Sequence, residues 1–347
     1  MTVYPRGDYW KEEIASLGVT VGNLNCEKYS DIYWGVQCLR GELRADKPDI
    51  IHTHLWTSNV IGRVAGRLSG VPVISSIHSP EYEPEATEGM SRSKLFAARQ
   101  IDKGTARFGC NRMIAVSNYV RNSAHQQIGY PLEKIDVIYN PIDMVQAPTF
   151  DKRILFDEIG LPADVVLIIN VGRIAPEKGL IYAIDAIEIV VKQMPNVHFV
   201  HIGANGASSY LTAVEARIKR SGISNNLHLI GERRDVEDFL RAADLFVFPS
   251  LFEGLGIALA EAMASRLPCV ASNIRPLDEF VANGVNGILV PPKNATVLAE
   301  AILDLLRSPE KMQRIGSAAR ETALAMFRPK PAADRLTEIY QTVAFNK

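Results

Sequence analysis

Short apolar runs alternate with longer amphipathic segments along most of this chain. In the first half, strands are predicted at 49–52, 72–77, 112–116 and 135–139, with helices at 30–46, 57–69, 92–108 and 118–128. In the second half, strands are predicted at 165–171, 197–202, 227–230, 245–248, 269–271 and 287–290. Strands that alternate with helices form parallel sheets with helices on both faces. The predicted fold class is therefore α/β with doubly wound sheets.

The length and one proline-containing segment indicate two domains. A single core rarely grows beyond about 250–300 residues, and this chain has 347. The segment 140–148 contains Pro141 and Pro148 and has no periodicity, so it is the predicted hinge. The expected parts are an N-terminal domain over 1–143, a second domain over 144–325 and a final segment over 326–347, which holds an amphipathic helix at 331–345.

Composition narrows the classes of partner and compartment. The 38 basic and 39 acidic residues give a net charge of −1, so nothing points to nucleic acid as a partner. The four cysteines lie far apart without a CxxC pair, which is typical of free thiols in a reducing compartment. The first residues contain no apolar signal segment, and no apolar run is long enough to cross a bilayer. We expect a cytoplasmic protein, with peripheral contact to the inner face of a membrane left open.

The strongest candidate for a ligand site is the segment 248–264, FPSLFEGLGIALAEAMA. A predicted strand ends at 248 and a helix begins near Gly256, so the N–H groups of the helix N-terminus are offered to an anion. Glu253 and Glu261 lie eight residues apart, about 12 Å along a helix axis, which suits two ends of one extended ligand. A carboxylate can accept from two neighbouring hydroxyls, so these glutamates are candidates for binding sugar and ribose. The alternative is a helix start with ordinary surface glutamates.

A second candidate is the segment 171–179, VGRIAPEKG, which lies between a predicted strand and a predicted helix. Its Arg173 and Lys178 supply one planar guanidinium and one compact ammonium, a suitable pair for a diphosphate. The segment lacks the spacing of a Walker loop. A loop with two solvated charges is the alternative, and taken alone the segment favours it.

Weaker signals lie at other strand ends. Gly203 and Gly206 follow the strand at 197–202, where a nucleotide could lie. His78 follows the strand at 72–77, where it could bond a ligand or steer a proton, and a capping histidine is the alternative. His52 and His54 form an HxH pair, but no third ligand has metal-site spacing, so a metal site is rejected.

The segment 91–112 predicts a basic amphipathic helix. It carries six basic residues against one acid, Asp102, and has an apolar side. Such a helix can contact anionic lipid headgroups. The sequence slightly favours an ordinary solvated helix face, and an anionic membrane surface is the alternative partner.

Together these segments resemble the family-4 retaining glycosyltransferases of the GT-B fold, over nearly the whole chain. The E-x7-E element of the family is matched from Glu253 to Glu261, and its G-R-x4-K-G element by Gly172, Arg173, Lys178 and Gly179. The resemblance implies two Rossmann-like domains that face each other across a cleft. The first would bind the acceptor, the second would bind the donor, and the final helix would cross back to the first. It also implies a UDP- or GDP-sugar as co-substrate, a glycan or lipid-linked acceptor, and no metal ion.

The resemblance implies a role for each matching residue. Arg173 and Lys178 would bind the donor diphosphate. Glu253 would bind the donor sugar, Glu261 the ribose hydroxyls, and His78 would lie near the transferred sugar. The expected catalytic residues are His78, Arg173, Lys178 and Glu253, and the expected donor-binding residues are Gly172, Gly203, Arg233, Gly254, Leu255, Gly256, Ile257 and Glu261.

In two places the chain departs from the family pattern. Family members usually open with a strand and a glycine-rich loop, whereas this sequence opens with a predicted helix at 9–17 and a predicted strand at 19–24. Either the start codon is misplaced, or this is a shortened form whose first domain lacks this unit and a central strand. Arg266 stands where the family usually has glycine, with an expected effect on a helix C-cap.

Other functions stay open at this point. A glycoside hydrolase would use Glu253 and Glu261 as its carboxylate pair, but it needs no cationic clamp for a diphosphate. A nucleotide-sugar-binding protein without turnover and a GT-B epimerase would both keep the donor site. The sequence does not determine the donor base and sugar, the acceptor or the oligomeric state.

Overall fold

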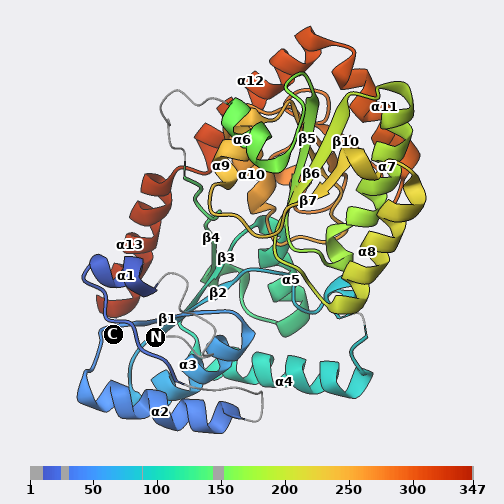
Figure 1. The fold of residues 1–347 in the computed structure, drawn as a ribbon. Coiled ribbons are helices and arrows are strands. Elements are labelled where there is room, and N and C mark those ends of the chain that lie inside the picture. The colour runs from blue at the N-terminus through green and yellow to red at the C-terminus, as the bar shows by residue number, and fades with distance from the viewer. Residues whose placement is uncertain (1–10, 25–30, 88, 144–151, 346–347) are drawn as a thin grey trace. The chain divides into compact units, whose positions relative to one another are not determined.

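The computed structural model describes residues 11–24, 31–87, 89–143 and 152–345 (Figure 1). The chain forms two compact units. Unit 1 comprises Met1–Ile138 and Ala333–Lys347, and unit 2 comprises Tyr139–Ala332. Each unit holds one sheet, and the strands in both sheets pair in parallel, so the predicted α/β class with doubly wound sheets is confirmed. Most of the predicted hinge, 144–148, lies outside the described residues.

Unit 1 is built on a four-stranded sheet in the order β1-β2-β3-β4. Its strands are β1 (Ile51–His54), β2 (Val73–Ile77), β3 (Arg112–Ala115) and β4 (Ile135–Val137). Its helices are α1 (Lys11–Ser16), α2 (Ile32–Ala45), α3 (Trp56–Ser69), α4 (Arg92–Gly109), α5 (Asn118–Ile128) and most of α13 (Pro329–Phe345). The chain therefore returns to unit 1 after completing unit 2.

The alternation of side chains along a strand separates the helices of unit 1 onto two faces of the sheet. Helix α3 packs on β1 and β2, and α5 packs on β3 and β4. Helix α13 packs on the other side chains of the same strands, where Ile74 and Ile114 form a buried cluster with Ile339 and Val343.

Polar contacts also hold α13 to unit 1. The Tyr340 hydroxyl lies 2.7 Å from Nδ1 of His52. Arg335 donates to Oδ1 of Asp136 at 2.8 Å, and Arg112 donates to the other oxygen of the same carboxylate. The returning helix is thus fixed by packing and by two polar anchors.

Unit 2 is built on a six-stranded sheet in the order β10-β9-β8-β5-β6-β7. Its strands are β5 (Val166–Val171), β6 (Val197–Ile202), β7 (Leu227–Leu229), β8 (Leu245–Phe248), β9 (Cys269–Ser272) and β10 (Ile288–Val290). Its helices are α6 (Lys152–Ile159), α7 (Leu180–Gln193), α8 (Ser208–Ser221), α9 (Val236–Ala242), α10 (Ile257–Ala264), α11 (Ala295–Leu306) and α12 (Pro309–Met326).

The order of strands in unit 2 reverses between β5 and β8. The chain first builds outwards from β5 through β6 to β7, then returns to place β8 on the other side of β5. Helices α7, α8 and α11 share one large core on one face, with alternate strand residues such as Ile168, Phe199 and Val247. Helices α9 and α10 contact the same strands separately from this core (Figure 1). Ligands bind at such reversal points in open α/β sheets.

Two details near element ends test sequence predictions. The predicted strand at 19–24 is wrong, because only Asn23 within it is a bridge residue. Its apolar alternation covers only Val19 and Val21 before Gly22 interrupts it, and Val19 is 52% exposed. The expectation for Arg266 is confirmed: it follows the C-cap of α10 with φ 65°, a left-handed conformation that favours glycine.

Candidate functional site

Two loops lie side by side at the carboxyl edge of the sheet in unit 2. The β5 loop is 172–179 and the β8 loop is 249–256. Because β5 and β8 are neighbours, the loops that follow them meet, and the N–H of Leu251 donates to the carbonyl of Glu177 at 2.8 Å. The two segments that the sequence suggested separately therefore form one site at the reversal point of the sheet.

Gly179 allows the close approach of the two loops. It has φ 65°, and a Cβ placed on it would lie 2.1 Å from the carbonyl oxygen of Pro249. Both the conformation and the contact exclude a side chain at this position.

We expect Gly179→Ala to separate the two loops. Its cost in unfolding free energy should be about 2–4 kcal/mol, because left-handed strain and a backbone clash add together. Gly222→Ala is the matched control, since Gly222 has φ 73° and nothing lies within 4 Å of the position that a Cβ would take. Denaturant unfolding of both variants would measure the difference, and equal losses would contradict a steric role for Gly179.

Lys178 and Glu253 form an ion pair that joins the two loops. Nζ of Lys178 lies 2.7 Å from Oε1 of Glu253, and the side chains are 22% and 9% exposed. Partial burial makes this pair stronger than an exposed one. An anionic ligand group at Lys178 would compete with Glu253 for the ammonium, so the pair holds the cation in place before a ligand arrives.

Arg173 is the more exposed of the two predicted cations. Its side chain is 67% exposed, and its NH2 lies 3.0 Å from Oε1 of Glu177. An exposed pair at this spacing contributes little stability, so its guanidinium can reorient towards a ligand at small cost.

The N-terminus of α10 completes this edge of the site. Gly256 is the N-cap residue, with φ 92° and no side-chain cap, so the positive end of the helix dipole is not covered by a capping side chain. Leu255 is 3% exposed, whereas Ile257 is 42% exposed. Of these two, only Ile257 presents its side chain to solvent, and Leu255 can offer only its backbone to a ligand.

Glu261 and Gly254 occupy the same strand–loop–helix unit as Glu253. Glu261 lies on α10, and burial raises its pKa. A carboxylate in this setting gains from hydrogen-bond donors such as a diol. Gly254 is buried in the β8 loop.

The remaining predicted donor-binding residues lie at the ends of β5, β6 and β7. The N–H of Gly172 donates to Ile202, and the N–H of Gly203 donates to Gly231, both at 2.9 Å. These bonds align three strand ends in one row. The structure therefore brings Gly172 and Gly203 to the same edge as the two loops.

Arg233 is held by carboxylates of its own unit. It is paired with Glu158 at 2.6 Å and with Asp235 at 2.7 Å, and its guanidinium lies over the ring of Phe239. This arrangement ties α6 to the start of α9. Donor binding by Arg233 stays a prediction.

A buried polar pair below the loops was not predicted from the sequence. Nδ1 of His201 lies 2.7 Å from Oδ1 of Asn170, and Nδ2 of Asn170 donates to the carbonyl of Val247. Burial lowers the pKa of His201 to about 4, so the ring is neutral and its Nδ1–H donates to the amide oxygen. The signal in the sequence was Asn170, the one polar residue of β5, in register with His201, one of the two histidines of β6.

In unit 1, His78 lies directly after β2 and is bonded to another histidine. Its Nε2 lies 2.9 Å from Nδ1 of His54 at the end of β1. Burial lowers the pKa of His78 to about 4, and burial also lowers the pKa of His54. The HxH pair was recognised in the sequence without a role for His54, although the period of two places His52 and His54 on one face of β1.

Metal sites and membrane spans can be assessed over the described residues. No group of three or more histidine, cysteine, aspartate or glutamate side chains in these residues is arranged to hold a metal ion. No helix within the same residues is both long and apolar enough to span a bilayer.

Comparison with known proteins gives matches over almost the whole chain. The family model described as Glycosyltransferase Family 4 matches residues 5–146, and the model described as Glycosyl transferases group 1 matches residues 151–322. The UDP-Gal:alpha-D-GlcNAc-diphosphoundecaprenol alpha-1,3-galactosyltransferase of Escherichia coli is 28% identical over 318 residues, which cover 88% of this chain and 78% of that protein. The alpha-maltose-1-phosphate synthase of Mycolicibacterium smegmatis is 28% identical over 86% of this chain and 80% of its own.

Solved structures show the same fold. The crystal structure of Anabaena HepE in complex with UDP-glucose has a TM-score of 0.84 and 23% identity, covering 96% of this chain and 89% of HepE. Sucrose-phosphate synthase from Thermosynechococcus elongatus has a TM-score of 0.78 and 19% identity, covering 93% and 81% of the two chains. The two family models together match residues 5–146 and 151–322. This protein therefore belongs to the GT-B glycosyltransferases of the family-4 type.

Proposed function

We propose that this enzyme transfers a hexosyl group from a UDP- or GDP-sugar to a glycan or lipid-linked acceptor, with retention of the anomeric configuration. The observation that carries the proposal is the Lys178–Glu253 pair, which joins two donor-site motifs beside the N-terminus of α10. The named nucleotide in the Escherichia coli relative and in the HepE complex favours UDP over GDP.

The chemistry we assign to unit 2 is mainly electrostatic. A nucleoside diphosphate is a good leaving group once its charge is matched, so positioned cations and dipoles can supply much of the catalysis. Lys178, Arg173 and the α10 N-terminus would stabilise the charge that develops on the diphosphate. A diphosphate bound there needs no metal ion in this proposal.

The carboxylates would orient the donor at its two ends. Once the diphosphate replaces Glu253 as the partner of Lys178, Glu253 would accept hydrogen bonds from sugar hydroxyls. Glu261 would accept from the ribose diol. Backbone groups of Gly254–Ile257 would contact the sugar and the phosphates. His78 in unit 1 is the residue that the family resemblance assigns to the transferred sugar.

Thermal unfolding with UDP, GDP, ADP and their sugar conjugates tests the donor assignment. A ligand at 100 times its Kd adds about 2.7 kcal/mol of stability, which gives a readable shift. We expect a shift with uridine nucleotides, and no shift with any nucleotide would contradict the proposal.

Turnover then separates transfer from the other functions. Sugar transfer to an undecaprenyl-linked or soluble glycan, with the α-configuration seen by NMR, would support the retaining transferase. Cleavage of a simple glycoside without nucleotide would indicate a hydrolase. Interconversion of free UDP-sugars without acceptor would indicate an epimerase, and binding without turnover on a panel of acceptors would indicate a binding protein.

We also propose that the exposed face of α4 contacts an anionic membrane surface. Phe96, Ile101 and Phe108 are 66%, 45% and 71% exposed. Asp102, the acid of this helix, points inwards and pairs with Arg63. The exposed basic residues around the apolar ones are Arg92, Lys94, Lys103 and Arg107. An apolar, basic helix face without an exposed acid suits a phospholipid interface, where a lipid-linked acceptor would reside.

Vesicle binding measures the contribution of α4. We expect K103Q/R107Q to lower partition onto vesicles with anionic lipid about 30-fold, since each cation near such a surface contributes about 1 kcal/mol. Binding to purely zwitterionic vesicles should be weak for wild type and variant alike. The control is K192Q, which removes an exposed cation from α7 in unit 2. Equal partition of K103Q/R107Q and wild type would refute the membrane role.

A further inference from the structure

His54 and His78 contact each other at the ends of β1 and β2, and the two residues are here called the histidine pair. Nδ1 of His54 and Nε2 of His78 are 2.9 Å apart. Two neutral imidazoles at this distance share one proton, so one ring donates and the other accepts. The tautomer of His78 is therefore fixed by the tautomer of His54.

The surroundings of the pair oppose protonation. Burial is the main cause that lowers the pKa of His78 to about 4, and a positive charge on His54 lowers it further. His52 lies beside the pair, with its ring centroid 4.3 Å from that of His54, and burial and its two neighbours lower its pKa to about 4 as well. Tyr340 of α13 contacts His52, and its hydroxyl adds no negative charge at neutral pH.

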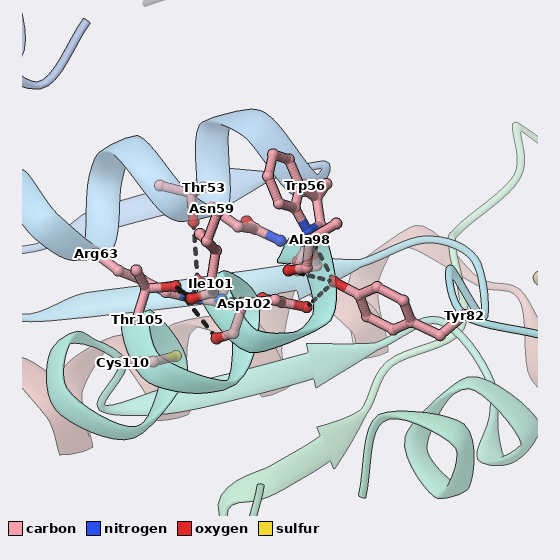
Figure 2. Close-up of polar contacts among 12 residues, drawn as sticks. Thr53, Trp56, Asn59, Arg63, Tyr82, Ala98, Ile101, Asp102, Thr105 and Cys110 are labelled. Atoms are coloured by element: carbon pink, nitrogen blue, oxygen red, sulfur yellow. Dashed lines mark hydrogen bonds and ion pairs between the residues drawn. The ribbon is translucent and has the colours of Figure 1, made fainter. Parts of the chain in front are cut away.

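The turns that carry the two histidines are tied to each other. Trp56, two residues after His54, donates from its indole N–H to the hydroxyl of Tyr82 at 2.7 Å. Tyr82, four residues after His78, donates to Oδ2 of Asp102 at 2.9 Å (Figure 2). The other oxygen of Asp102 accepts from Arg63, whose side chain is 1% exposed. One chain of hydrogen bonds, part-buried at Trp56 and Tyr82 and buried at Asp102 and Arg63, thus anchors both turns.

The turn after β1 is held in a strained conformation. Leu55 has φ 69° and ψ 155°, a region that non-glycine residues rarely occupy, and its side chain is 60% exposed. Such strain persists only where the surroundings enforce it, and it concentrates at functional sites. The anchor through Trp56 and Tyr82 supplies that enforcement here.

The charged groups of the anchor are Asp102 and Arg63, and Glu81 lies near both. Asp102 is neutralised by Arg63, and burial raises the pKa of Glu81 to about 8, so this carboxyl is mostly protonated at neutral pH. The hydrogen bonds of Asp102 go to Arg63 and Tyr82, and the histidine pair bonds within itself. Protonation of His78 is therefore governed chiefly by burial and by His54.

We propose that His54 is a positioning residue that holds the His78 imidazole neutral, in one orientation and with its tautomer coupled to that of His54, for its contact with the transferred sugar. This inference rests on the proposed transferase function. The pair itself depends on unit 1 alone, so it can be measured whether or not the transferase proposal holds. His54 acts through His78 and needs no contact with substrate.

Nitrogen-detected NMR of the histidine side chains tests the pair directly. In wild type we expect His78 to stay neutral well below pH 6, with its tautomer complementary to that of His54. In His54→Ala its pKa should rise, because the charge of His54 no longer opposes protonation, and its tautomer ratio should change. His54→Asn, whose amide can donate or accept in place of Nδ1, should keep a hydrogen bond to Nε2 of His78 and leave its tautomer ratio closer to wild type. His228→Ala, a histidine removal in unit 2, is the matched control and should leave His78 unchanged.

Kinetics give the second readout. With His54→Ala we expect kcat to fall about tenfold with KM for the donor nearly unchanged, the effect of losing one orienting hydrogen bond. If neutral His78 is required, activity falls as pH drops through its pKa. A raised pKa therefore moves the acid limb of the kcat profile to higher pH. His54→Asn should restore most of kcat.

The two proposals fail in distinguishable ways. A His78 spectrum and pKa that are the same in wild type and in folded His54→Ala would overturn the role of His54. Wild-type protein that shows the coupled pair by NMR but no sugar transfer would instead overturn the proposed function. Tyr82→Phe, which breaks the anchor while keeping both histidines, should loosen the pair if the turns position it, and an unchanged spectrum would exclude the anchor from that role.

Discussion

Lys178→Ala is expected to lower kcat/KM for the donor by about 100- to 1,000-fold, the usual cost of removing one preorganised group that stabilises developing charge. Lys178 is the better ordered of the two cations in the β5 loop, because Glu253 holds its ammonium at 2.7 Å. Its loss removes the cation that would face the diphosphate and leaves Glu253 buried without its partner. Steady-state kinetics measure the fall in kcat/KM, and calorimetric titration with UDP measures the loss of affinity for the nucleotide.

Controls separate this effect from a general change in charge. Lys192→Ala removes an exposed lysine of unit 2 that is paired with Glu188 at i,i+4, and it should change kcat/KM less than about twofold. Arg173→Ala should have a smaller effect than Lys178→Ala, since Arg173 is more exposed and must reorient to reach a ligand. Equal UDP affinity in wild type and Lys178→Ala would exclude Lys178 from the diphosphate site.

Asp102→Ala is expected to destabilise unit 1 by about 3–5 kcal/mol, the cost of breaking a buried ion pair by removing one partner. Arg63 is 1% exposed on its side chain, and without Asp102 its guanidinium still donates to the hydroxyl of Ser75, a neutral group that cannot balance its charge. Tyr82 also loses its acceptor on Asp102. Denaturant unfolding followed by a probe in unit 1 measures the loss.

The matched control for this prediction removes both charges. Arg63→Leu/Asp102→Leu should recover most of the stability, because apolar residues of similar size can replace a buried pair at little cost. Removing Lys192, whose side chain is 64% exposed and pairs with Glu188, should cost less than about 1 kcal/mol. A small loss in Asp102→Ala alone would show that water reaches Arg63 and that the pair is not a buried anchor.

Periodicity was sufficient to predict most of the architecture. The helix predicted at 118–128 coincides with α5, and the run at 197–202 coincides with β6, because long uninterrupted patterns are decided by local burial. The run at 19–24 was wrong because two alternating valines are too few to specify a strand. The β1 run was placed two residues early, since its polar end, Thr53–His54, carries no hydrophobic signal.

The sequence analysis named candidate residues for the site but could not predict the contacts between them. Lys178 and Glu253 stand in separate motifs, 75 residues apart, and their ion pair depends on β8 lying beside β5. Asp102 was visible in the sequence as the lone acid of a basic helix. Its inward position was not predicted, and its partner Arg63 lies on another helix and could not be deduced. Pairings of this kind depend on which elements become neighbours, and that is a property of the whole fold.

The return of α13 to unit 1 has a consequence for how the protein is made. The strands of unit 1 leave the ribosome first, and then the 194 residues of unit 2, 139–332, must be synthesised before α13 follows. At about 5–20 residues per second this takes about 10–40 s. During this interval Ile74 and Ile114 lack the cover of Ile339 and Val343. Unit 2 can complete its core during this interval, whereas unit 1 becomes whole only after α13 has left the ribosome. Damage to the last turns of α13 therefore affects strands that were synthesised before unit 2.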